Sequence, residues 1–116
     1  MEYNQETTEL ESLGFISLKL GETLNKRLNG LGYVFMGKDW SSYDYFREIK
    51  NDEDQTITHF HIMIMSQTYN NDHAVFIFKE LHTLENDKLI ITRIPFDESE
   101  KSKIIKLLKV CWWKFW

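Results

Sequence analysis

The stretch Gln55-Thr-Ile-Thr-His-Phe-His-Ile-Met-Ile-Met-Ser66 decides the fold, because it is the longest run in the sequence with the composition and alternation of a β-strand. Successive side chains of a strand point to opposite faces of the sheet. One face therefore carries Ile57, His59, His61, Met63 and Met65, and the other carries Thr58, Phe60, Ile62 and Ile64. The second face is largely apolar and predicts core. The first face mixes imidazoles with thioethers and is the candidate face for binding a partner or a ligand.

Short polar connections on both sides of this stretch predict hairpins. Segments rich in Asn, Asp or Gly separate β-like runs at 33–36, 42–50, 55–67, 74–84 and 89–94. Connections this short join neighbouring antiparallel strands and leave no room for a helical crossover. Pro95 ends the last run, because proline has no backbone N–H to donate to a neighbouring strand. We therefore expect an antiparallel meander of about five strands.

A helical segment is expected before the meander. Thr8-Glu-Leu-Glu11 has the spacing of a capping box and predicts a helix that starts there and that Gly14 can end. Residues 15–20 alternate like a strand, yet they also continue a leucine stripe at helical spacing, so both structures stay open for them. Residues 22–29 favour a helix.

A second helix is expected after the meander, over residues 98–113. Asp97-Glu-Ser-Glu100 again has capping-box spacing. The apolar side of this helix carries Ile104, Ile105, Leu107, Leu108, Cys111 and Trp112, and lysines lie on the other side. A sheet built from hairpins needs a cover on one face, so this amphipathic helix is expected to pack there.

The predicted class is α+β: an N-terminal helical segment, an antiparallel meander of about five strands, and a C-terminal amphipathic helix packed on one sheet face. The side chains expected on the covered face are Phe60, Ile62, Ile64, Phe76, Phe78, Ile90 and Ile94. Those expected on the open face are His59, His61, Met63, Met65, Val75, Ile77 and Lys79.

Length and composition predict one globular domain over residues 1–116, with residues 1–6 frayed. A chain of 116 residues with 42% hydrophobic and 28% charged residues has enough apolar surface for a single core. The net charge of −4 argues against nucleic acid as a partner. A lone cysteine, no signal-peptide pattern and no apolar run of about 18 residues favour the cytoplasm and exclude a transmembrane segment.

The pair His59 and His61 is a candidate half of a metal site. Residues two apart on a strand lie on the same face, about 6.6 Å apart at Cα, so two imidazoles can converge on one ion. Met63 and Met65 on the same face would favour a soft ion such as Cu(I), and a histidine of the next strand could add a ligand, either His73 or His82. The alternative is that the histidines are hydrogen-bonded sheet residues and the methionines fill gaps.

Recognisable catalytic motifs are absent from the sequence. It has no nucleophile elbow, no H-E-x-x-H, no C-x-x-C and no phosphate-binding glycine loop. Cys111 lies among apolar residues of the expected helix, where cysteine is usually an inert small hydrophobe. An enzyme without a recognisable motif therefore stays a remote alternative.

Aromatic residues crowd the C-terminus. Trp112, Trp113, Phe115 and Trp116 cannot all point one way, so Trp113 or Trp116 is expected at the surface, where tryptophan often anchors a partner. A membrane-surface helix is disfavoured, because the apolar face that would enter the lipid is the face that covers the sheet.

These patterns favour a small non-enzymatic protein-interaction domain, such as an inhibitor, an immunity protein or an accessory protein. The partner would be another protein or a second copy of the chain, with Met63, Met65, Trp113 and Trp116 as candidate contacts. The alternative is a domain that binds a small ligand or a metal ion on the open sheet face around His59 and His61. No other cofactor is expected.

Overall fold

The computed structural model describes residues 2–4 and 10–109. The elements, in chain order, are β1 (Glu2–Asn4), β2 (Glu11–Ile16), α1 (Glu22–Gly30), β3 (Val34–Lys38), β4 (Ser42–Asn51), β5 (Thr56–Tyr69), β6 (Asp72–Glu85), β7 (Lys88–Ile94) and α2 (Glu98–Leu108). A largely antiparallel sheet with two helices agrees with the predicted α+β class.

The sheet has seven strands in the order β1-β7-β6-β5-β4-β3, with β2 beside β6. One edge of β6 is shared: residues 73–77 pair with β2 and residues 79–85 pair with β7. Only the pairing of β1 with β7 is parallel among the described strands. The predicted order of hairpins from β3 to β7 is therefore present, and β1 and β2 extend it.

Two-residue turns close two of the long hairpins. Asn70 and Asn71 between β5 and β6 both have positive φ, and so do Asn86 and Asp87 between β6 and β7. Asn and Asp tolerate this left-handed conformation better than other residues with a Cβ, and two such residues in succession form the turn that matches the twist of the flanking strands. The sequence therefore specifies these turns locally.

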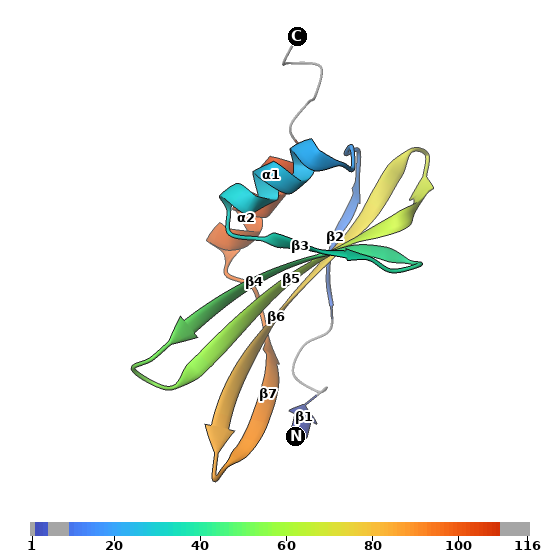
Figure 1. Cartoon of the computed structure of the whole chain (residues 1–116). Coiled ribbons are helices and arrows are strands. Elements are labelled where there is room, and N and C mark those ends of the chain that lie inside the picture. The colour runs from blue at the N-terminus through green and yellow to red at the C-terminus, as the bar shows by residue number, and fades with distance from the viewer. Residues whose placement is uncertain (1, 5–9, 110–116) are drawn as a thin grey trace.

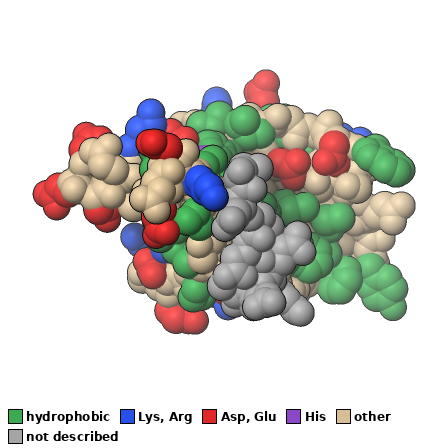
Figure 2. Space-filling model, turned by 90° about the horizontal axis from the view of Figure 1, so that it is seen from below, with side chains coloured by type: hydrophobic (Ala, Val, Ile, Leu, Met, Phe, Trp, Pro, Cys, Tyr) green, Lys and Arg blue, Asp and Glu red, His purple; other side chains and the backbone are tan. Residues whose placement is uncertain are grey.

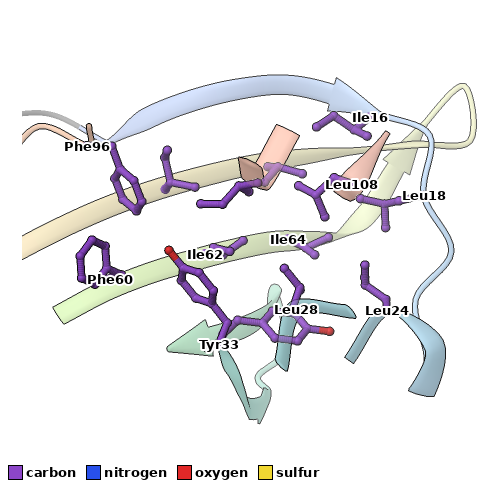
Figure 3. Packing of buried hydrophobic residues seen from close by; sticks show 14 residues of the cluster. Ile16, Leu18, Leu24, Leu28, Tyr33, Phe60, Ile62, Ile64, Phe96 and Leu108 are labelled. Carbon is purple, nitrogen blue, oxygen red and sulfur yellow. The ribbon is translucent and has the colours of Figure 1, made fainter. Parts of the chain in front are cut away.

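The core lies between one sheet face and both helices (Figure 1). On β5 the buried side chains are Phe60, Ile62 and Ile64, as the alternation predicts. Leu24 and Leu28 of α1 and Leu108 of α2 are fully buried in the same cluster (Figure 3). Ile104 of α2 is fully buried in it too. Both helix pairs are four residues apart, so one stripe of each helix faces the sheet.

The prediction of which β6 side chains lie on the covered face is wrong. The register pairs Ile62 with Ile77 and Ile64 with Val75, and directly opposite residues share a face. Val75, Ile77 and Lys79 therefore lie on the covered face, where Val75 and Ile77 are fully buried, and Phe76 and Phe78 lie on the open face. On β7 the half-buried Ile90 and Ile94 share the covered face as expected, and the buried Ile91 lies opposite His82 on the other face.

The N-terminal region also differs from the expectation. Glu11–Ile16 form strand β2 with a bulge near Gly14 (φ +81°), and not the end of a helix that starts at Thr8. Glu2–Asn4, expected to be frayed, pair with β7, whereas residues 1 and 5–9 lie outside the described residues. Residues 15–20 are strand up to Ile16 and irregular afterwards, and the helix expected over 22–29 is α1.

The capping box expected at the start of α2 does not form. Asp97 is the N-cap residue, but its side chain makes no capping hydrogen bond. Glu100 instead accepts a hydrogen bond of 2.8 Å from the Tyr33 hydroxyl and pairs with Arg47. Residues 110–113 of the expected helix, Cys111 and Trp112 included, lie outside the described residues.

The molecule is elongated, about 55 × 26 × 25 Å, because the β4–β5 and β6–β7 hairpins extend beyond the helices (Figure 1). Within the part of the chain that is described, no helix is long and apolar enough to cross a membrane.

Candidate functional site

The open sheet face carries a group of titratable side chains, here called the histidine cluster: His59, His61, Glu80 and His82. The register brings it together from β5 and β6, because His59 lies opposite Glu80 and Ile57 lies opposite His82. On the other side of β5, His59 lies opposite Glu48 and His61 opposite Phe46. The cluster therefore sits over the two central strands, away from the helices.

Glu80 is the centre of the cluster. Its Oε1 atom lies 3.6 Å from Nε2 of His61 and 3.5 Å from Nε2 of His82. Its Oε2 atom lies 3.8 Å from Nη2 of Arg93 on β7. One ligand atom each from His59, His61 and Glu80 can be chosen so that all lie within 4.8 Å of one another. Among the described residues, these three side chains form a group that could hold a metal ion.

Aromatic rings fix the imidazoles in place. The ring of Phe78 stacks on His61 with centroids 4.2 Å apart and planes 7° apart. Phe46 approaches His59 and His61 edge-on, with centroid distances of 4.8 and 5.2 Å. The ring centroids of His59 and His82 lie 4.0 Å apart. Packed rings have few rotamers, so the donor atoms are held before any ligand arrives.

Burial lowers the pKa of His61, and the neighbouring carboxylate of Glu80 opposes this effect. A lowered pKa favours the neutral ring near pH 7, and a neutral imidazole has a lone pair for a cation. Nε2 of His59 lies 2.9 Å from Oε2 of Glu48, so that carboxylate holds one nitrogen of the ring. Together the cluster offers imidazole nitrogens and a carboxylate oxygen, which is chemistry for binding a cation.

The two other histidines differ in their placement. His82 joins the cluster, whereas Nδ1 of the buried His73 lies 2.7 Å from the backbone oxygen of Met65 and supports the irregular end of β5. Glu80 was missed at the sequence level. It lies two residues before His82, and the pairing of β5 with β6, whose register shifts between Ile64 and Thr68, brings it opposite His59.

A second feature lies at the opposite end of the sheet from the β4–β5 turn. A pocket of about 510 Å³, here called the aromatic pocket, is lined by Phe15, Trp40, Ser41, Met65, Gln67, Thr68, Tyr69 and Ala74. Trp40 is 93% exposed, Tyr69 67% and Phe15 59%. Figure 2 shows hydrophobic side chains gathered at the right of the molecule, the side on which the β3–β4 and β5–β6 turns lie in Figure 1.

The candidate contact residues are distributed between these features and the undescribed terminus. Met65 lines the aromatic pocket. Met63 is half-buried between the positions of Asp44 and Phe76. Trp113 and Trp116 lie outside the described residues. Phe15, Trp40 and Tyr69 were not among the candidates, although each stands at or beside a strand end, where a ring has little core to pack against.

Comparisons with protein-family models, with curated proteins and with solved structures give no match. We therefore infer the function from the geometry of this chain.

Proposed function

We propose that the protein is a small non-enzymatic interaction domain that binds another protein through the aromatic pocket. The observation that carries the proposal is the exposure of three aromatic side chains, Phe15, Trp40 and Tyr69, around one pocket. Large apolar side chains grouped at the surface are typical of protein–protein contact sites, whereas scattered single ones are ordinary. Exposed tryptophan and tyrosine are the residue types that most often dominate binding energy.

The surroundings of the pocket support a protein as the ligand. Val34 and Met36 of β3 are 52% and 63% exposed, and β3 runs into Trp40 through the β3–β4 turn. In the described chain no strand pairs with the outer edge of β3. An unpaired edge with apolar side chains can accept an extended segment from a partner, whose backbone hydrogen bonds add to the contacts of the rings.

The rigidity of the aromatic pocket supports a role as an inhibitor, immunity protein or accessory protein. An inhibitor, immunity protein or accessory protein needs a rigid contact surface and no reacting groups. The ring centroids of Phe15 and Tyr69 lie 5.8 Å apart. The backbone N–H of Ser66 donates a hydrogen bond of 2.9 Å to the backbone oxygen of Ser41, and this bond joins two walls of the pocket. A preformed surface loses less conformational entropy on binding. A second copy of the chain is the alternative partner for this surface.

Affinity capture tests the proposal. Tagged wild-type chain, a Trp40→Ala variant and a Leu84→Ala variant are compared by quantitative mass spectrometry in lysate of the source organism. Leu84 is a matched control, because it is 67% exposed and lies on the β6–β7 hairpin, outside the aromatic pocket. We expect a protein that wild type and Leu84→Ala retain and Trp40→Ala loses. Light scattering distinguishes a homodimer, whose mass would halve in Trp40→Ala.

The cytoplasm is the proposed location. The support is compositional: one cysteine in 116 residues allows no internal disulfide, which suits a reducing compartment. Fractionation of cells that express the untagged chain would contradict this part if the protein were recovered outside the cytoplasmic fraction.

A further inference from the structure

Two buried nitrogens of the histidine cluster, Nε2 of His61 and Nε2 of His82, have no hydrogen-bond partner among the described residues. A buried polar atom without a partner costs free energy, so native structures rarely leave one without a reason. Both atoms lie near the same oxygen, Oε1 of Glu80, at 3.6 and 3.5 Å. These distances are too long for good hydrogen bonds between nitrogen and oxygen.

The same spacing suits two ligands of one metal ion. Nitrogen and oxygen ligands lie about 2.1 Å from a tetrahedral zinc ion, which places two ligand atoms about 3.4 Å from each other. The distance of 3.6 Å between His61 Nε2 and Glu80 Oε1 is close to that value. His59 offers a third ligand atom within 4.8 Å of the other two.

We propose that His59, His61 and Glu80 bind a divalent transition-metal ion of the zinc class. Imidazole nitrogens with a carboxylate oxygen are a donor set typical of zinc, whereas Cu(I) prefers thiolates and thioethers. The sequence pattern, which joined the two histidines to Met63 and Met65, favoured the softer ion. The third ligand that the structure supplies is the oxygen of Glu80.

The surroundings resemble the outer shell of a metal site. Arg93 lies 3.8 Å from Oε2 of Glu80, which leaves Oε1 toward the histidines, and Glu48 holds one ring nitrogen of His59. Such partners orient the ligands and raise their affinity for the ion. The side chains of His59 and His61 are 20% and 26% exposed, so an ion can reach the cluster from solvent.

Calorimetric titration of the full chain with ZnCl₂ in a buffer free of chelators tests the site. We expect one ion per chain for wild type, and at least about tenfold weaker binding for His61→Gln and for Glu80→Gln. Glu53→Gln, which removes an exposed carboxylate of the β4–β5 turn, is the matched control and should bind like wild type. Wild type that binds no zinc, or variants that bind it equally well, would overturn the proposal.

A measurement on wild type alone guards against variants that fail to fold. Long-range nitrogen–proton NMR spectra report each imidazole separately, and the chain has four histidines. Addition of one equivalent of Zn²⁺ should move the ring signals of His59 and His61. The signals of His73 should stay in place, because its Nδ1 is hydrogen-bonded to the backbone oxygen of Met65. Shifts confined to His73, or no shift at all, would contradict the site.

Discussion

The Tyr33 hydroxyl donates a hydrogen bond of 2.8 Å to the carboxylate of Glu100, across 67 positions of sequence. Tyr33 lies between α1 and β3, and Glu100 lies in the first turn of α2, so the bond joins the segment after α1 to α2. Arg47 of β4 pairs with the same carboxylate oxygen. This triad positions α2 over the sheet, in place of the capping box for which the sequence has the spacing.

Replacement of Glu100 by alanine should therefore destabilise the fold. The substitution leaves the buried hydroxyl of Tyr33 and the half-buried guanidinium of Arg47 without their shared acceptor, at a cost of about 1–3 kcal/mol. Glu98→Ala, in the same helical turn but exposed, should cost less than about 1 kcal/mol. Urea denaturation of both variants checks the difference, and equal costs would argue against the triad.

Alkaline pH should unfold the protein through its buried tyrosines. Burial, with a smaller contribution from nearby Tyr43, raises the pKa of Tyr45 to about 12 from an ordinary value of 10.0, and burial also raises the pKa of Tyr33. The unfolded state therefore ionises first, so the stabilisation is complete below pH 10 and is lost as the pH rises toward 12.

Urea midpoints measured from pH 9 to pH 12, with tyrosinate absorbance as a second signal, test this dependence. Tyr45→Phe should flatten the decline above pH 10, because it removes the ionising group. A decline as steep as that of wild type would assign the alkaline unfolding to other groups.

Acid should loosen the β3–β4 turn. Oδ1 of Asp39 accepts hydrogen bonds of 2.8 Å from the backbone N–H groups of Ser41 and of Ser42, and these bonds lower the pKa of Asp39. Since the folded pKa is lowered, the stabilisation is present above the ordinary value of 3.8 and is lost as the pH falls through the folded value.

Amide hydrogen exchange of Ser41 and Ser42 reports this turn directly. We expect their protection to fall in acid for wild type, after correction for the intrinsic exchange rate, and to be low at all pH values for Asp39→Ala. Protection that is the same in both proteins would show that the carboxylate does not hold the turn.

The face assignment of β6 predicts a difference between two neighbouring residues. Ile77 is fully buried opposite Ile62, so Ile77→Ala should cost about 2–5 kcal/mol. Phe76 lies half-buried on the open face, so Phe76→Ala should cost less, although it removes more atoms. Thermal and urea unfolding of the two variants would contradict the register if Phe76→Ala proved the more damaging.

Local patterns were sufficient for the part of the fold that depends on near neighbours. The alternation of Phe60, Ile62 and Ile64, the Asn70-Asn71 turn and the helix over 22–29 all agree with the structure. Each depends on periodicity or on backbone preference within a few residues. The face of β6 could also have been derived, because a two-residue turn at 70–71 pairs even positions of β5 with odd positions of β6.

Pairings between distant segments could not be predicted from local patterns. Residues 11–16 are a strand because they pair with residues 73–77 of β6, and nothing within the segment outweighs its helical stripe. The aromatic pocket likewise combines β2 with the β3–β4 turn and with residues of β5 and β6. For the site, His59 and His61 were visible as a pair, but Glu80 joins them only through the strand register.

The affinity of the captured partner for wild type and for Trp40→Ala is the most direct test of the proposed function. A ring that is 93% exposed in the free domain and becomes buried at the centre of an interface contributes about 2 kcal/mol or more, which corresponds to a dissociation constant at least about thirtyfold larger for Trp40→Ala. Leu84→Ala should bind like wild type. A dissociation constant that does not change in Trp40→Ala would contradict binding through the aromatic pocket.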